Sequence, residues 1–175
     1  MSTTTIEETL HSVFSNVNDW LKFAEQKNAA LLVLNGGVVW GVTRVISKLE
    51  QLTELTYWLM LCGYALIVVS ALICLISFLP VLTEKWFKPE ERKPADNCLY
   101  FADIAKYDNN HYVQLLASKL GKPDYIPNNY ELDLSSQIVT NSEIAFDKYK
   151  RFRLASIVTI IGVLLFSLAI GTHYF

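Results

Sequence analysis

The chain has 175 residues, a formal net charge of −2 and a hydrophobic fraction of 52%. The near-neutral charge argues against a surface that binds nucleic acid, and the hydrophobic fraction leaves little sequence for a large soluble domain. The sequence contains neither a P-loop nor a GxGxxG motif, its three histidines are isolated, and its three cysteines lack metal-ligand spacing. It therefore predicts neither an enzyme nor a metal protein.

Residues 1–27 are predicted to form an amphipathic helix. Their apolar positions recur at steps of three and four, which places them on one helical face. These positions are Ile6, Leu10, Val13, Phe14, Val17, Leu21 and Ala24. The segment is polar and acidic, whereas a secretory signal begins with a basic region followed by an apolar core. We therefore expect it to remain in the mature protein and to lead into the first membrane span.

Three apolar runs predict three transmembrane helices, at residues 28–48, 55–83 and 154–173. The second run has 29 consecutive residues without Asp, Glu, Lys or Arg, and the third has 19 such residues, from Leu154 to Thr172. About 20 apolar residues suffice to cross a bilayer as a helix. The first run has only 16 uncharged residues before Arg44, whose long side chain can reach the interface. A buried or re-entrant helix is the alternative for this run.

The distribution of basic residues predicts the orientation. Thirteen of the fifteen Lys and Arg residues lie before residue 28 or between residues 84 and 153, and the loop between the first two runs has only Arg44 and Lys48. Basic residues concentrate on the cytoplasmic side of membrane proteins. The N-terminus and residues 84–153 are therefore expected in the cytoplasm, and the C-terminus on the opposite side.

The segment 84–153 is predicted to be a small helical cytoplasmic domain. Its eleven acidic and eleven basic residues balance, with the basic ones concentrated at its two ends. That pattern suits either a domain lying against the membrane or a dedicated anion site. Asn109 or Asn110 can cap a helix that carries His111 to Leu120. From Leu132 onward nothing interrupts a helix, so one long helix is expected to run into the third span.

Small and polar residues in the first run indicate a helix-helix contact. Gly37 and Gly41 form a small-xxx-small step close to Asn35, which allows close backbone approach and a hydrogen bond between helices in lipid. Two interpretations remain open, namely self-association, with or without a hydrated path, and packing against the second span of the same chain.

Residues of the long final helix form a polar stripe. Asp133, Gln137, Asn141, Lys148 and Phe152 follow at steps of four, four, seven and four. A solvated face is the simple explanation. The alternative places Gln137, Asn141 and Lys148 against the N-terminal helix, where amides and a cation can hold a small phosphorylated ligand.

Three sequence blocks in a fixed order resemble the Pycsar effector family of small bacterial membrane proteins. They are FAEQKNAALLVLNG from Phe23, CLYFADIA from Cys98, and DLSSQIVTNSEIAFDKYKRFRLA from Asp133. The resemblance implies a role in anti-phage defence, in which the effector is encoded beside a nucleotide cyclase. On infection the cyclase makes a cyclic nucleotide, which in Pycsar systems is a cyclic pyrimidine mononucleotide. The effector responds by damaging the inner membrane.

The polar stripe and the three sequence blocks together supply the predicted ligand site, and no ligand signature is carried over from the family. The ligand-binding set is Gln137, Asn141, Lys148, Arg151, Tyr149 and Phe101, with a cation for the phosphate and Tyr149 or Phe101 for the base. Asn35, Gly37 and Gly41 are the predicted contacts of a homo-oligomer in the lipid bilayer of the bacterial inner membrane. The predicted fold is all-α, with three transmembrane helices and a small helical cytoplasmic domain. The alternative function is a constitutive membrane adaptor that docks a cytoplasmic protein.

Overall fold

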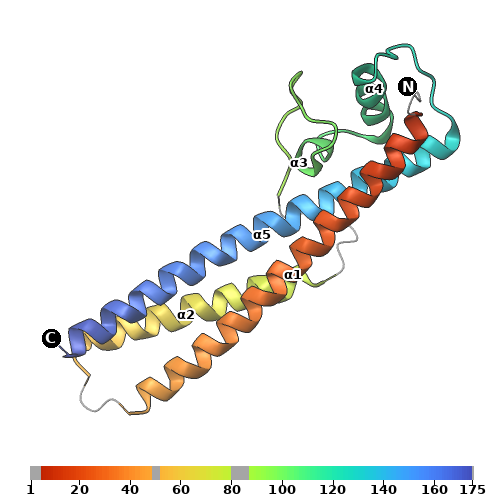
Figure 1. Cartoon of the computed structure of the whole chain (residues 1–175). Coiled ribbons are helices and arrows are strands. Elements are labelled where there is room, and N and C mark those ends of the chain that lie inside the picture. The colour runs from red at the N-terminus through yellow and green to blue at the C-terminus, as the bar shows by residue number, and fades with distance from the viewer. Residues whose placement is uncertain (1–4, 49–51, 80–86, 175) are drawn as a thin grey trace. The chain divides into compact units, whose positions relative to one another are not determined.

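The computed structural model describes residues 5–48, 52–79 and 87–174. Within these residues the chain forms α-helices and no strand, so the all-helical fold class is confirmed. The helices are α1 (Ile6–Ile46), α2 (Glu54–Ser77), α3 (Phe101–Ile104), α4 (Asn109–Lys119) and α5 (Asn129–Tyr174) (Figure 1). The chain divides into two compact units. Unit 1 contains residues 1–24 and 81–149, and unit 2 contains residues 25–80 and 150–175.

Reciprocal side-chain hydrogen bonds fix where the two longest helices begin. At the start of α1, Thr5 Oγ1 accepts the Glu8 backbone N–H at 3.2 Å, and the Glu8 carboxylate accepts the Thr5 N–H at 2.9 Å. Asn128 and Glu131 exchange the same two bonds before α5, each at 2.9 Å. These capping boxes satisfy N–H groups that the first turn of a helix leaves without partners. Consequently α5 begins at Asn129, ahead of the expected Leu132.

Asp108 caps α4, so the expectation that Asn109 or Asn110 does so is wrong. The Asp108 carboxylate accepts the His111 backbone N–H at 3.0 Å, and Asn109 is already the first helical residue. A carboxylate at this position also interacts favourably with the positive end of the helix dipole. Gly121, whose φ is 75°, follows the end of α4 in the left-handed conformation that glycine adopts most easily.

Unit 1 is held together by one apolar core. The face of α1 that carries Ile6, Leu10, Val13 and Val17 is at most 2% exposed. It packs in one cluster with residues from α3, α4 and α5, among them Phe101, Ile104, Tyr112, Leu116 and Ile138. The three-and-four spacing read from the N-terminal sequence is the spacing of these buried positions.

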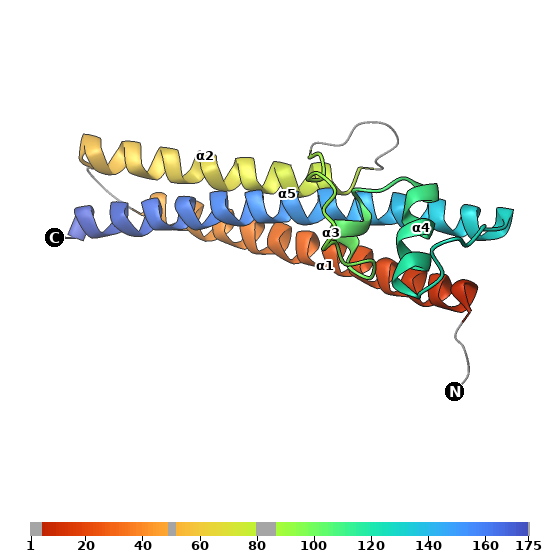
Figure 2. The same cartoon turned by 90° about the horizontal axis from the view of Figure 1, so that it is seen from above.

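Unit 2 contains the apolar parts of α1, α2 and α5, which run side by side (Figure 2). All three helices are long and apolar enough to cross a membrane. Many of their large apolar side chains are exposed, such as Val33 at 76% and Leu164 at 62%, as expected for helices that face lipid. The predicted second span ran to Thr83, whereas α2 ends at Ser77, and residues 80–83 lie outside the described residues.

Two glycines allow α2 and α5 to approach closely in unit 2. A Cβ on Gly63 would lie 2.9 Å from the Gly162 carbonyl oxygen, and a Cβ on Gly162 would lie 3.0 Å from the Gly63 carbonyl oxygen. Neither glycine was singled out from the sequence. Close backbone packing at small residues is a common way for helices to associate in lipid, where the hydrophobic effect between helices is lost.

We expect Gly63→Ile to lower the stability of unit 2 by about 1–3 kcal/mol, the usual cost of overpacking. The added side chain must push apart the backbones of two helices. Thermal unfolding in detergent measures the loss, and Gly36→Ile serves as the control because no atom lies within 4 Å of its added Cβ. Equal unfolding temperatures for the two variants would show that the contact at Gly63 does not hold the helices together.

Candidate functional site

Aromatic side chains from α1, α3 and α5 lie together in unit 1. The Phe101 ring stacks on the Tyr149 ring, with centroids 5.1 Å apart and planes 23° apart. Trp20 of α1 lies 5.5 Å from Phe101 and 6.2 Å from Tyr149, and Tyr100 packs edge-on against Phe101 at 4.8 Å. Trp20 and Tyr100 are 36% and 43% exposed. The cluster joins the predicted Phe101 and Tyr149, but Phe101 is only 4% exposed. The aromatic surface on which a planar base can stack is therefore that of Trp20 and Tyr100.

The two predicted amide side chains on α5 have different surroundings in unit 1. Asn141 donates from Nδ2 to Asn18 Oδ1 on α1 at 2.8 Å, so its amide contacts the N-terminal helix. Gln137 is exposed and lines a groove of about 330 Å³. The other residues of this groove are Tyr130, Asp133, Leu134 and Ser136. The polar stripe thus includes one residue engaged with α1 and one open to solvent.

The two predicted cations are both buried, and they belong to different units. Lys148, in unit 1, is 6% exposed, and its neighbour Asp147 accepts the Phe87 backbone N–H at 3.1 Å. Arg151, in unit 2, donates from Nη1 to the Ile76 carbonyl oxygen at 3.2 Å. The same carbonyl oxygen accepts the Leu79 backbone N–H at 3.1 Å. Arg151 is thus a second donor at the negative end of the α2 dipole, where a cation is favourable.

A buried ion-pair network organises the segment before and after α3. Lys106 Nζ lies 2.7 Å from Asp96 Oδ1 and 2.6 Å from Asp103 Oδ1, and the side chains of Lys106 and Asp96 are 7% and 3% exposed. Tyr107 donates its hydroxyl proton to Asp96 at 3.0 Å, and Lys119 donates to the Asp96 carbonyl oxygen at 2.8 Å. The network joins this segment to the end of α4, and none of its residues was predicted to interact.

The charges of this network alter pKa values in opposite directions. Burial raises the pKa of Asp96, but hydrogen bonds from Lys106, the Lys93 backbone and Tyr107 outweigh it and lower that pKa to about 2. Burial lowers the pKa of Lys106, but its bonds to Asp103 and Asp96 outweigh it and raise that pKa. Both groups therefore stay charged across the physiological pH range.

A second charged group lies on the same segment. Arg92 donates to Asp108 at 2.9 Å and to the Lys106 carbonyl oxygen at 2.9 Å, and its guanidinium lies 5.0 Å from the centre of the Tyr107 ring. The backbone N–H of His111, together with Arg92, holds the pKa of Asp108 well below its usual range. These contacts anchor the chain on both sides of α3, which carries Phe101.

Asn35 lies in a buried polar network that joins the three helices of unit 2. Its Nδ2 donates to Ser70 Oγ on α2 at 2.9 Å, and its Oδ1 accepts from Thr159 Oγ1 on α5 at 2.9 Å. Ser70 and Thr159 lie 2.8 Å apart, and Ser70 also donates to the Ala155 carbonyl oxygen at 2.8 Å. Each polar group of the Asn35 amide therefore has a partner within the chain, as the packing interpretation required.

Gly37 and Gly41, the other predicted oligomer contacts, face open space. A Cβ added at either glycine would meet no atom within 4 Å. The close approach that they permit is therefore not used within unit 2. Packing within the chain therefore explains Asn35. Self-association remains open for Gly37 and Gly41, because within the described part of unit 2 no helix occupies the space beside them.

Comparison with known proteins identifies the family. The Pycsar effector protein domain model matches residues 9–173. A Pycsar effector protein of Propioniciclava tarda is 25% identical over 164 residues, which cover 91% of this chain and 77% of that relative. No solved structure matches. The chain belongs to the Pycsar effector family.

Pycsar effectors of this kind are transmembrane proteins of anti-phage defence, which agrees with the three apolar helices. The family match includes most of α1, all of α2 and nearly all of α5, so it covers residues of both units. Among the described residues of this Pycsar effector, no group of three or more His, Cys, Asp or Glu side chains could hold a metal ion. The ion pairs and aromatic rings of unit 1 are instead the prominent polar and stacking groups.

Proposed function

We propose that this Pycsar effector binds a cyclic nucleotide through unit 1 and then impairs the bacterial inner membrane, so that the infected cell stops supporting the phage. The observation that carries this proposal is the family match over residues 9–173, which includes both the aromatic cluster and all three apolar helices. The ligand is a cyclic pyrimidine mononucleotide made by a cognate cyclase.

The base stacks on the exposed side of the aromatic cluster, at Trp20 and Tyr100, because Phe101 is only 4% exposed. The two predicted ligand residues Phe101 and Tyr149 stack on each other and support these two side chains from within unit 1. Stacking of a base on an aromatic side chain contributes about 1–3 kcal/mol. Asn141 supplies an amide, and Lys148 supplies the cation for the single phosphate charge.

Binding at Lys148 requires a rearrangement in unit 1, because Lys148 is only 6% exposed. A ligand shifts a conformational equilibrium only when it binds one state better than the other. A state of unit 1 in which Lys148 reaches the phosphate binds the ligand better than the state in which Lys148 is buried, so the ligand favours it. Since α5 supplies residues to both units, a movement of α5 is the direct way for the bound state to alter the spans.

Reconstituted vesicles test this function. The protein is placed in phosphatidylethanolamine–phosphatidylglycerol vesicles that hold a potassium diffusion potential, and a potential-sensitive dye follows the potential. We expect cyclic CMP or cyclic UMP to collapse it and linear CMP or UMP to leave it intact. A potential that survives every cyclic nucleotide, with the protein shown to be inserted, would favour the constitutive adaptor instead.

We expect a reporter fused after Phe175 to lie in the periplasm and one inserted near Lys122 to lie in the cytoplasm. The reason is that thirteen of fifteen basic residues fall in the N-terminal segment and residues 84–153. Paired alkaline phosphatase and green fluorescent protein fusions report the two sides. If both positions report the same side, the orientation with a cytoplasmic N-terminus and three spans is wrong.

The double variant Gly37→Ile with Gly41→Ile should weaken a homo-oligomer without unfolding the chain. Both positions face open space, and an isoleucine there prevents another helix from approaching closely. Crosslinking in membranes measures the oligomer, and Gly171→Ile is the control because its added Cβ also meets no atom within 4 Å. Unchanged crosslinking in the double variant would show that these glycines do not form the oligomer contact.

A further inference from the structure

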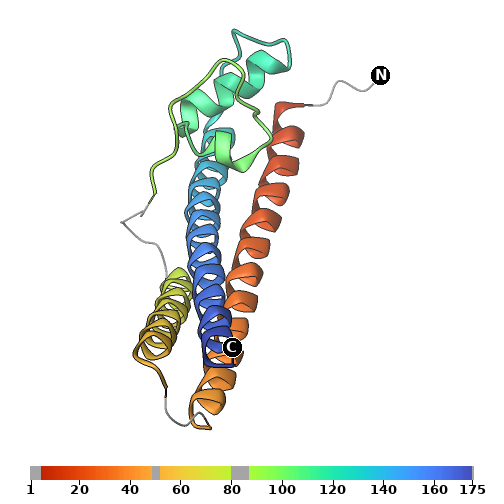
Figure 3. The ribbon, with the colours of Figure 1, turned by 90° about the vertical axis from the view of Figure 1, so that its left-hand side faces the viewer.

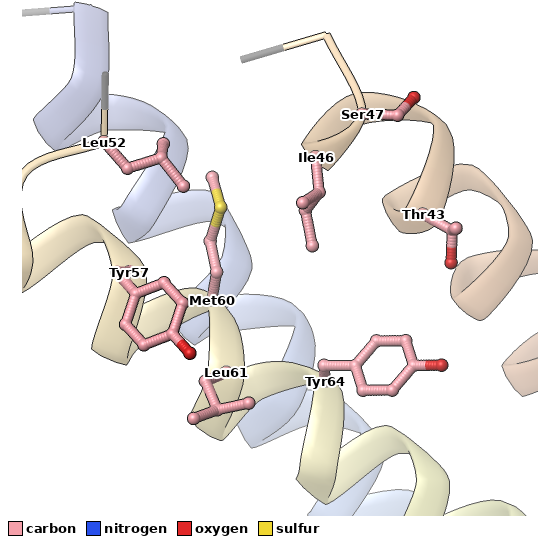
Figure 4. Close-up of a pocket in the computed structure, with 8 residues that line it drawn as sticks. All are labelled: Thr43, Ile46, Ser47, Leu52, Tyr57, Met60, Leu61 and Tyr64. Carbon is pink, nitrogen blue, oxygen red and sulfur yellow. The ribbon is translucent and has the colours of Figure 1, made fainter. Parts of the chain in front are cut away.

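An apolar cleft opens between α1 and α2 in unit 2. It encloses about 470 Å³ and is lined by Thr43, Ile46, Ser47, Leu52, Tyr57, Met60, Leu61 and Tyr64. Ile46 of α1 and Tyr64 of α2 face the space between the two helices (Figure 4). Figure 3 shows the same ends of α1 and α2. The cleft therefore lies at one end of two membrane-spanning helices.

The chemistry of the lining favours an apolar occupant. Thr43 donates its hydroxyl proton to the Val39 carbonyl oxygen at 2.8 Å, and Ser47 donates to the Arg44 carbonyl oxygen at 2.9 Å. These two hydroxyls are therefore satisfied by their own backbone. Ile46, Leu52, Met60 and Leu61 supply hydrocarbon surface. An apolar cavity of about 150 Å³ already stays dry and binds benzene, so this larger cleft has room for a flexible hydrocarbon chain.

The surroundings of the cleft identify the source of that chain. The neighbouring side chains Trp40, Leu55 and Trp58 are 67%, 61% and 53% exposed, as expected for residues in contact with lipid. Within a bilayer, the molecules that can fill a cleft open to the outside of the helices are lipids and other membrane helices. An acyl chain adapts to an irregular cleft, whereas a second helix requires a wide, continuous surface.

Two exposed basic side chains at the same end of the helices can bind a phosphate. Arg44 directly follows Thr43, is exposed, and lies with its guanidinium 5.6 Å from the centre of the Trp40 ring. Lys48 directly follows Ser47 and is also exposed. A guanidinium binds phosphate oxygens in a bidentate manner. Glu54, in the first turn of α2, lies at this end too, and Glu50 follows Lys48 by two residues, so the basic and acidic residues of this end balance. A phosphate is therefore bound by direct contact with Arg44 and Lys48 and not by an excess of positive charge.

We propose that this cleft is a phospholipid site, in which one acyl chain lies among Ile46, Leu61 and Tyr64 and the lipid phosphate is bound by Arg44 and Lys48. The lipid fills the space between the first two spans and stabilises their arrangement. Because the site is in unit 2 and requires no cyclic nucleotide, it is independent of the proposed sensing function.

Native mass spectrometry tests the proposal with the full chain. The protein is extracted in mild detergent from vesicles of phosphatidylethanolamine and phosphatidylglycerol, and retained lipids are counted. We expect the parent to retain a phospholipid and Leu61→Trp, which fills the cleft, to reduce the lipid-bound fraction at least tenfold. Ile46→Phe is a second filling variant in case Leu61→Trp does not fold. Leu72→Trp is the matched control, because Leu72 is on α2, is 51% exposed and does not line the cleft.

The phosphate contact has its own variant. Arg44→Gln should lower lipid retention several-fold while the unfolding temperature measured without added lipid stays close to that of the parent. Three results would overturn the proposal. These are a parent that retains no phospholipid, folded filling variants that retain as much as the parent, and efficient disulfide crosslinking between two copies of Ser47→Cys in membranes, which would make the cleft an interface between copies.

Discussion

Replacing Lys106 by methionine should destabilise unit 1 by about 3 kcal/mol, because removal of one partner of a buried ion pair leaves the other charge without compensation. In the parent, Lys106 bonds to both Asp96 and Asp103, and the Asp96 side chain is only 3% exposed. Hydrogen exchange of the α4 amides measures the loss within unit 1. Lys93→Met is the control, because Lys93 pairs with Glu90 through exposed side chains and should change stability little.

The same variant should weaken the dependence of stability on acidic pH. In the parent, the pKa of Asp96 is lowered to about 2, so its contribution is present above the ordinary value of 3.8 and is lost as the pH falls through 2. The pKa of Lys106 is raised, so its contribution is present below 10.5 and is lost as the pH rises through the raised value. Without Lys106, only the Lys93 backbone and Tyr107 still oppose the effect of burial on Asp96, so the pKa of Asp96 is lowered less than in the parent. The variant should therefore lose less stability than the parent as the pH falls from 4 toward 2, and an equal loss would contradict the account of the network.

Replacing Trp20 by alanine should weaken cyclic-nucleotide binding about 5- to 150-fold, which corresponds to the loss of about 1–3 kcal/mol of base stacking. Trp20 lies against both Phe101 and Tyr149, and the residue is 36% exposed, so its removal takes away stacking surface and little of the buried core. Fluorescence anisotropy of a labelled cyclic nucleotide measures the affinity. Trp20→Phe should retain most of the binding.

Two further variants separate stacking from general damage. Trp58→Ala removes an exposed tryptophan from α2 in unit 2 and should bind the nucleotide as the parent does. Asn141→Ala removes the hydrogen bond to Asn18 and should weaken binding by a smaller factor. Lys148→Ala is a harder test because Lys148 is buried, so folding must be checked first. Undiminished binding by folded Trp20→Ala would place the ligand site elsewhere.

The sequence predicts the elements of this fold well because they depend on local patterns. Long uncharged runs must be helical in lipid, where each backbone polar group needs a partner inside its own segment. The repeat at Ile6, Leu10, Val13 and Val17 likewise predicts one buried helical face. Helix ends were predicted less well, because the residue that caps a helix is decided by the direction of its side chain. Asp108, which caps α4, is followed by two Asn residues that could cap a helix equally well by residue type. Asn128 and Glu131 cap α5 by the same kind of side-chain bond.

Contacts between distant residues could not be predicted in the same way. Gly63 and Gly162 each look like isolated glycines, and only the crossing of α2 and α5 brings them together. Gly37 and Gly41 have the small-xxx-small spacing that is typical of close helix packing, yet they face open space. Asn35 was recognised as a polar residue in a span, but its partners Ser70 and Thr159 lie on other helices. A polar residue in lipid predicts that a partner exists, not which one.

In the predicted ligand set, too, residue chemistry was predicted better than contacts between distant residues. Phe101 and Tyr149, one in α3 and one in α5, were selected for their base-stacking chemistry, and they stack on each other. Trp20 was missed although it follows Val17 by three residues and Val13 by seven, which places it at the edge of the apolar face. Helical spacing does not show that its ring meets Phe101 and Tyr149. Helical spacing placed Asn141, Lys148 and Arg151 along one helix, but it could not show that Lys148 and Arg151 are buried in different units.

Isothermal titration calorimetry of the full chain in detergent tests the central claim most directly. Cyclic CMP and cyclic UMP are titrated into the parent protein, with linear CMP and UMP as controls. The account predicts saturable binding of at least one cyclic pyrimidine nucleotide and none of the linear forms. Absence of heat for both cyclic nucleotides, with vesicle assays also unresponsive, would contradict it and leave the adaptor function as the better explanation.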